Sequence, residues 1–263
     1  MLLGAREIPH EKDQAPLILL AIDDITESKE LLLKINEELK HIAYATSHDL
    51  QEPLRMVVSY TQLLAREYKG KLDEQADQFI GYAVEGALRM ETLLKDLREY
   101  WAVNEHGLED PVPVDCNRVC EEILQVLDAV IHESGATATH DQLPIVLAEE
   151  VPMRLLFQNL IGNAIKYRRP GEPVQIHIRA RRKAGLWRFS VADNGIGIEA
   201  QHLKTIFAPF KRLHGLDKYP GSGIGLAICK KIVERSGGQI WAESAYGQGS
   251  TFHFTLPAKD GDV

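Results

Sequence analysis

Three polar side chains at helical spacing could hold a metal ion and a phosphate. Asn159, Asn163 and Lys166 are four and three residues apart, so a helix would place them on one side. Amide oxygens are hard ligands that suit Mg²⁺, and a lysine can meet a phosphate as a point charge. Tyr167 follows and offers a flat apolar surface to a base. The polar face of an ordinary helix is the alternative interpretation of this segment alone.

A second segment could recognise the base itself. Asp193 ends an expected strand and begins the run DNGIG, which contains Gly195 and Gly197. A carboxylate there can accept a hydrogen bond from the exocyclic amine of adenine, and glycines let the backbone approach the ring closely. A plain turn is the alternative, because Asn-Gly is a common turn pair.

A third segment could bind an anion through its backbone. Residues 221–226 read GSGIGL and precede an expected helix, so free amides at the helix N-terminus would face a phosphate. A lone GxGxG is weak evidence, but here it is the third of three segments with compatible chemistry.

A histidine far upstream could act as a nucleophile. His48 lies in the run SHDLQEPLR at residues 47–55. Neutral imidazole is a good nucleophile near pH 7. Asp49 could hydrogen-bond one ring nitrogen, fix the tautomer and leave the other nitrogen free to attack phosphorus. Without its neighbours, such a histidine would be read as an ordinary surface residue.

In order and spacing, these segments resemble a sensor histidine kinase. SHDLQEPLR resembles the H-box of dimerising histidine kinases in its phytochrome-related form. NLIGNAIKY, DNGIGIEA, IFAPFKRL and GSGIGLAI resemble the ATP-binding domain of the GHKL superfamily. The resemblance implies that ATP, with Mg²⁺, phosphorylates His48, and that the phosphoryl group then passes to an aspartate in the receiver domain of a response regulator.

The resemblance also implies roles for individual residues. Asn163 would ligate magnesium, Lys166 and Asn159 would approach the phosphates, and Asp193 would bind adenine. Residues 211–220 would form a mobile lid in which Arg212 and His214 could contact phosphate. Phe207 and Phe210 match the F-box, and Thr251 matches a residue near the adenine. The expected ATP-binding set is Asn159, Asn163, Lys166, Tyr167, Asp193, Gly195, Gly197, Phe207, Phe210, Arg212, Gly221, Gly223, Gly225, Leu226 and Thr251.

One position departs from the common H-box pattern. Glu52 stands at the fourth position after the histidine, where Thr or Asn usually orients a water for phosphatase activity. A carboxylate near a phosphorylated residue should repel it, so the sequence predicts weak phosphatase activity.

The elements that position these residues divide the chain into helical and α/β parts. Leu32, Ile35, Leu39 and Ile42 step by three and four, as in a coiled-coil seam. Two long helices with so few apolar residues cannot bury a core alone, so we expect a homodimer with a four-helix bundle. A coiled-coil spacer without chemistry is the alternative. Alternating helices and strands then predict an α/β sandwich, with helices on one face of a mixed sheet.

We expect the following domains. They are a PAS-like remnant with its exit strand at 1–27, a dimerisation and phosphotransfer domain at 28–103, a linker at 104–113, a catalytic ATP-binding domain at 114–259 and a tail at 260–263. The isolated strand at 17–21 suggests that the chain is a fragment of a longer protein.

Bulk composition narrows the possible partners and location. Net charge is −8, which disfavours sequence-independent binding to nucleic acid. No apolar stretch approaches the roughly 18 residues of a membrane span, so we expect a cytoplasmic chain without membrane contact. Cys116, Cys120 and Cys229 form no CxxC pair and suit a reducing compartment, although a metal or redox role is the alternative.

Two other functions stay open at this point. A pseudokinase could use ATP and dimer conformation only as a binding switch. A GHKL ATPase like gyrase is the other possibility, but such enzymes carry a water-activating glutamate where this chain has Asn159, and an amide is no general base.

Overall fold

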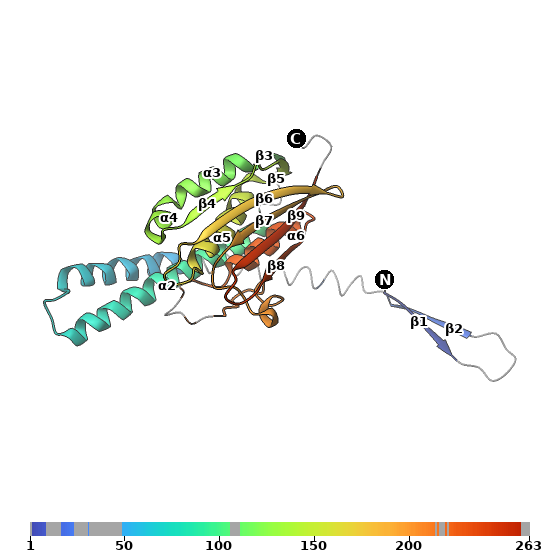
Figure 1. The fold of residues 1–263 in the computed structure, drawn as a ribbon. Helices are drawn as coiled ribbons and strands as arrows, with labels where there is room; N and C mark the ends of the chain where they lie inside the picture. Colours follow the sequence, from blue (N-terminus) through green and yellow to red (C-terminus); the bar gives the residue numbers. More distant parts are fainter. Residues whose placement is uncertain are drawn as a thin grey trace. The chain divides into compact units, whose positions relative to one another are not determined.

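A computed structural model describes most of the chain in two compact units, residues 1–50 and 51–263. It describes residues 2–8, 17–23, 31, 49–105, 111–213, 215, 219 and 221–258. His48, His214 and half of the expected lid lie outside these ranges. Figure 1 shows the fold and the labels used below.

The described part of the first unit contains an antiparallel pair of strands. β1 (Leu2–Ile8) pairs with β2 (Leu17–Asp23), so that Leu2 faces Asp23 and Ile8 faces Leu17. The sequence predicted a strand at 17–21 but not its partner β1.

The second unit begins with a helical hairpin. Residues 49–68 are helical, and α2 (Glu74–Glu105) follows. The run Lys-Gly-Lys at residues 69–71 predicts a break between the two helices, and Asp73 is the predicted cap of the second. At this break Gly70 has φ 73° and donates its N–H to the Asp77 carboxylate at 2.9 Å. Asp73 accepts the N–H of Ala76 at 2.8 Å and caps the second helix. Leu54, Val58 and Ala87 pack together between the two helices.

The α/β sandwich expected from the sequence is confirmed. A five-stranded mixed sheet has the order β4-β6-β7-β9-β8, in which only β4 and β6 are parallel, and β3 pairs separately with β5. Its elements are β3 (Val112–Asp115), α3 (Cys116–Val126), α4 (Asp128–Ser134), β4 (Thr137–His140), β5 (Ile145–Ala148), α5 (Glu150–Lys166), β6 (Gln175–Lys183), β7 (Leu186–Asp193), the 3₁₀ helix η1 (Ala200–His202), α6 (Gly225–Arg235), β8 (Ile240–Ser244) and β9 (Ser250–Pro257).

The core lies between the sheet and the helices. α5 and α6 pack against one face of the sheet (Figure 1). Phe157 of α5 meets Phe189 and Phe254 edge-on, while those two rings stack at 4.7 Å. This packing fixes α5, the helix that carries the expected metal and phosphate residues, against the centre of the sheet.

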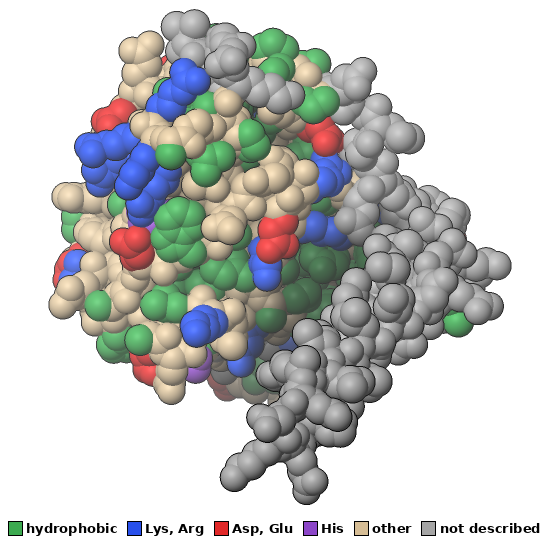
Figure 2. All heavy atoms as spheres, turned by 90° about the vertical axis from the view of Figure 1, so that its right-hand side faces the viewer, with side chains coloured by type: hydrophobic (Ala, Val, Ile, Leu, Met, Phe, Trp, Pro, Cys, Tyr) green, Lys and Arg blue, Asp and Glu red, His purple; other side chains and the backbone are tan. Residues whose placement is uncertain are grey.

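The other face of the sheet is basic, although the chain is acidic overall. Arg179, Arg181 and Lys183 alternate along β6, and Arg188 of β7 joins them in lining a shallow cavity. Figure 2 shows one face of the molecule, on which several Lys and Arg side chains adjoin one another while acidic side chains are scattered. Positive charge is therefore concentrated on this face of the sheet.

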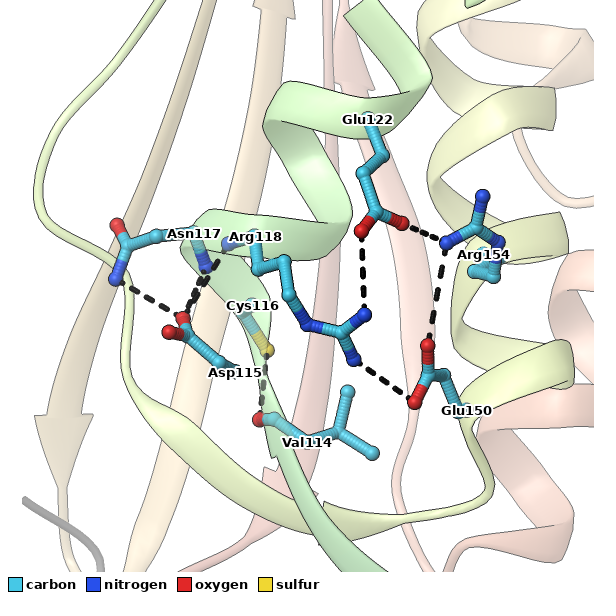
Figure 3. Close-up of polar contacts among 8 residues, drawn as sticks. All are labelled: Val114, Asp115, Cys116, Asn117, Arg118, Glu122, Glu150 and Arg154. Carbon is cyan, nitrogen blue, oxygen red and sulfur yellow. Dashed lines mark hydrogen bonds and ion pairs between the residues drawn. The ribbon is translucent and has the colours of Figure 1, made fainter.

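Ion pairs hold α3 to the start of α5. Asp115 caps α3 by accepting the N–H of Asn117 at 2.8 Å (Figure 3). Arg118 pairs with Glu150 at 2.8 Å, and Arg154 pairs with Glu122. The network crosses between the two helices twice, so it fixes their register.

Two boundaries differ from the sequence-based expectation. β3 begins at Val112, inside the range expected as linker, because Val112 and Pro113 pair with β5. The sequence pattern of residues 117–131 predicts one continuous helix, but the structure interrupts it at Leu127, which ends α3 and precedes α4. Across the described residues, no helix combines the length and apolar character needed to cross a bilayer.

Candidate nucleotide-binding cleft

Helix α5 brings the expected metal and phosphate residues to one cleft with two adjoining cavities. Asn163 and Tyr167 line both cavities, whereas Asn159 and Lys166 line only the second. The Lys166 ammonium lies 4.6 Å from the centre of the Tyr167 ring, so the two side chains form one cation–π pair. The spacing noted in the sequence therefore places these side chains on one face of α5, where they line the cleft.

The first cavity combines one partly buried carboxylate with an apolar wall. Asp193 lines it, and the Oδ1 atom of Asp193 accepts the N–H of Gly195 at 2.8 Å and that of Ser250 at 3.2 Å. Burial raises the pKa of Asp193 to about 6, although these two hydrogen bonds lower it. Because both bonds end on Oδ1, Oδ2 is the atom placed to receive a ligand's amine.

The apolar wall suits a flat aromatic ring. Its side chains come from the segment after β7, the segment before the lid, the lid itself, the start of α6 and β9. They are Ile196, Ile198, Ile206, Leu213, Leu226 and Phe252. Of these, the sequence singled out only Leu226, because single apolar residues in loops carry no periodic signal.

Glycines shape the second cavity by allowing close approach. A Cβ on Gly225 would lie 2.4 Å from the Asn159 Oδ1, and one on Gly221 would lie 2.6 Å from the Lys166 Nζ. Gly223 has φ 78°, and a Cβ there would lie 2.9 Å from the carbonyl oxygen of Lys211. The loop can therefore bring its backbone against both α5 and the start of the lid only without side chains.

The cavity's donors fit a magnesium-bound phosphate chain. Lys166 and Lys211 supply positive charge, and Asn159 and Asn163 supply amide oxygens. Lys211, Ser222 and Asp96 also line this cavity and were not predicted as site residues. Ser222 stood within the predicted glycine run, but Asp96 lies in the distant helix α2 and gave no local signal.

The two F-box phenylalanines and the lid residue Arg212 occupy different environments. Phe207 is buried and meets Phe252 edge-on at 6.5 Å, whereas Phe210 is exposed with φ 60°. Neither lines the cleft, but the Phe207 ring packs against Phe252, which does line it. Arg212 does line it, and donates to the carbonyl oxygen of Tyr219 at 2.9 Å.

The placement expected for Thr251 is wrong. Side chains alternate along β9, so Ser250 and Phe252 reach the nucleotide cavity, while Thr251 lines the basic cavity on the other face. The register of β9 against β7, with Ser250 opposite Asp193, sets this outcome.

The phosphoacceptor region is described only in part. His48 lies outside the described residues. Asp49 and Glu52 are helical and exposed. Their chemistry toward His48 therefore stays a prediction from sequence.

Two protein families match the two parts of the chain. The family described as "Histidine kinase-, DNA gyrase B-, and HSP90-like ATPase" matches residues 148–260. The family described as "His Kinase A (phospho-acceptor) domain" matches residues 38–101, which include His48.

Similar proteins include phytochromes and sensor kinases. Cyanobacterial phytochrome A of Nostoc sp. is 46% identical over 241 residues, which are 92% of this chain and 31% of that protein. The sensor protein kinase WalK of Staphylococcus aureus is 32% identical over 256 residues, 93% of this chain and 59% of that protein. The chain spans about a third of the length of the phytochromes that it matches.

Solved structures share the fold. ShkA, crystallised full-length with AMPPNP, has a TM-score of 0.65 at 26% identity, covering 85% of this chain and 47% of ShkA. The histidine kinase ThkA, in complex with the response regulator protein TrrA, has a TM-score of 0.57 at 23% identity, covering 98% of this chain and 75% of that one.

Proposed function

This chain belongs to the sensor histidine kinases of two-component systems, and on that premise we propose that it phosphorylates its own His48 and passes the phosphoryl group to a response regulator. The observation that carries the proposal is the cleft. One partly buried carboxylate, two lysines and a glycine loop converge there, in the same chain as a matched phosphoacceptor domain.

Different residues of the cleft would bind the adenine, the phosphates and the magnesium ion. Asp193 would accept the adenine amine, and the apolar wall would cover the ring. Lys166 and Lys211 would bind the phosphates, and the amide oxygen of Asn163 would hold the magnesium ion, which offsets charge on the transferring phosphoryl group. The AMPPNP in the similar ShkA structure supports this assignment.

The reaction consists of two balanced transfers. A ring nitrogen of His48 attacks the γ-phosphorus, a nitrogen–phosphorus bond forms, and the bond to the β-phosphate oxygen breaks to release ADP. Asp49 would orient the imidazole by accepting its other N–H. A receiver aspartate then takes the phosphoryl group, and His48 returns to its neutral form.

A homodimer would complete the helical hairpin. Large apolar side chains stay exposed along both of its helices: Leu50, Met56, Val57, Tyr60, Leu63, Leu64, Tyr68, Phe79, Tyr82, Leu88 and Met90. A second copy would bury them in a four-helix bundle. Sedimentation at micromolar concentration should give a dimer, and a stable monomer would contradict this assembly.

The N-terminal strands, the partner and the location of the chain belong to the same proposal. The strand pair β1–β2 is compatible with the end of a PAS-like domain. A response regulator in complex with ThkA supports a receiver domain as partner. Because the reaction consumes ATP, we place the chain in the cytoplasm.

Labelling with γ-³²P-ATP tests the proposal against its alternatives. The wild-type protein should form an acid-labile, base-stable phosphoprotein, and His48→Gln should form none while binding ADP with unchanged affinity. Magnesium-dependent nucleotide binding without phosphoprotein would favour a pseudokinase. Steady release of phosphate without phosphoprotein would favour an ATPase, which Asn159 disfavours because its amide donates to the Leu155 carbonyl and cannot act as a base.

A further inference from the structure

A carboxylate from helix α2 lies at the phosphate end of the cleft. Asp96 lines this cavity together with Lys166, Lys211 and the glycine loop. Among the described residues that line it, Asp96 alone is acidic. Its position is unexpected, because a cavity built for phosphates should exclude fixed negative charge.

Asp96 also ties the glycine loop to helix α2. The Ser222 hydroxyl donates to the Asp96 carboxylate, and the same hydroxyl accepts the N–H of Ile224 at 3.1 Å. The Ser222 side chain is buried, and its contact with Asp96 lies at the wall of the cavity that both residues line. One serine therefore links the first turn of the phosphate-binding loop to a carboxylate that lies 126 residues away in sequence.

Further contacts hold the end of α2 on the catalytic domain. Lys231 of α6 donates to the Tyr100 carbonyl oxygen at 2.6 Å and lies 4.0 Å from the centre of the Tyr100 ring. Arg235 donates to the Val103 carbonyl oxygen and pairs with Glu149. Because Val103 is buried in the main core, the Asp96–Ser222 contact lies at the edge of a larger docked surface.

We propose that Asp96 discriminates ATP from ADP and couples that choice to helix α2; the inference rests on the kinase function proposed above. Without a triphosphate, the carboxylate takes the place of an anion at the phosphate end and holds Ser222. A γ-phosphate brings further negative charge to the same cavity and competes for the same hydroxyl and lysines. ATP therefore displaces Asp96 and weakens the docking of α2, whereas the shorter ADP leaves the contact closed.

The ratio of two dissociation constants tests this role. Calorimetry with Mg²⁺ should measure the binding of ADP and of AMPPNP to the full chain. Asp96→Asn keeps an acceptor for Ser222 but removes the charge, so the preference for AMPPNP over ADP should increase roughly tenfold. Glu91→Gln removes an exposed charge from the same helix and should leave the ratio unchanged.

Two further measurements separate charge from structure. Ser222→Ala removes the hydrogen bond and keeps the carboxylate, so its ratio should stay near the wild-type value. Hydrogen exchange of the amides at 96–103 should be faster with AMPPNP than with ADP in the wild-type protein. Equal exchange with both nucleotides, an unchanged ratio in Asp96→Asn, or an equal increase in Ser222→Ala would overturn the inference.

These outcomes are distinct from failure of the proposed function. If the wild-type protein binds neither nucleotide with magnesium, the cleft is not an ATP site and the kinase proposal fails first. If both nucleotides bind and His48 is phosphorylated but the Asp96→Asn ratio is unchanged, only the role of Asp96 is refuted.

Discussion

The pKa of Asp193 should make adenine recognition depend on pH just below neutrality. Burial raises this pKa to about 6. The ionised carboxylate can accept the exocyclic amine of adenine, whereas the protonated group presents an O–H. Because the binding form is the deprotonated one, it is present above pH 6 and is lost as the pH falls through 6. One unit below the pKa, about nine-tenths of the sites are protonated, so adenine nucleotides should bind about tenfold more weakly at pH 5.

Inosine diphosphate isolates this effect from other titrations. Its ring carries an oxygen where adenine carries the amine, so the ionised Asp193 repels it and the protonated group can donate to it. A hydrogen bond to a charged group contributes about 1.5–3 kcal/mol, so ADP should bind roughly 10–150-fold more tightly than inosine diphosphate at pH 8. That preference should fall by at least about tenfold between pH 7 and pH 5.

The assay is calorimetric titration with both diphosphates between pH 5 and pH 8. Their phosphates ionise alike, so phosphate titration cancels in the ratio. Asp193→Asn carries no titrating group at this position, and its ratio should not vary with pH. A constant ratio in the wild-type protein, or an equal slope in Asp193→Asn, would refute the assignment of Asp193 to the adenine amine. Circular dichroism at each pH checks that the protein stays folded.

Other predictions concern the metal, the fold and the phosphatase reaction. Asn163→Ala should reduce ADP affinity in magnesium to its magnesium-free value; a retained magnesium effect, measured by calorimetry, would assign the ligand elsewhere. Gly238→Ala places a Cβ 1.8 Å from the Thr255 carbonyl oxygen and should lower the free energy of unfolding by about 1–3 kcal/mol or more in urea denaturation. Gly162→Ala, with open space in helix α5, should instead raise it by up to about 1 kcal/mol. Phospho-regulator mixed with ADP and the wild-type kinase should lose phosphate slowly, and Glu52→Gln should not be slower; slower loss in that variant would show that Glu52 assists hydrolysis.

Local chemistry made most of the cleft predictable. Asn163 and Lys166 follow from helical spacing, and Asp193 from a carboxylate beside glycines at the end of a strand. Thr251 was misplaced because strand register decides which face a residue occupies, and a shift of one position reverses that face. No window of sequence contains this register, since Ser250 pairs with Asp193 from 57 residues away.

Long-range contacts account for the remaining differences. β3 was missed because its four residues include a proline, and only pairing with β5 makes them a strand. Asp96 read as an ordinary polar residue of a long helix, because its partner Ser222 is in another domain. Helix-capping signals were more reliable, and Asp73 and Gly70 marked the hairpin turn correctly.

The uninterrupted helix α2 connects the core of the hairpin directly to the core of the catalytic domain. Ala87 is packed inside the hairpin, Val103 is packed inside the catalytic domain, and no loop interrupts the 32-residue helix that contains both. The two residues are about 24 Å apart along the helix axis. A bend of about 10° beside Ala87, where Gly86 offers little resistance, would swing Val103 sideways by about 4 Å. A displacement of that size exceeds the reach of a hydrogen bond, so a small rearrangement of the hairpin core is sufficient to open or close the contacts that α2 makes with the nucleotide cleft.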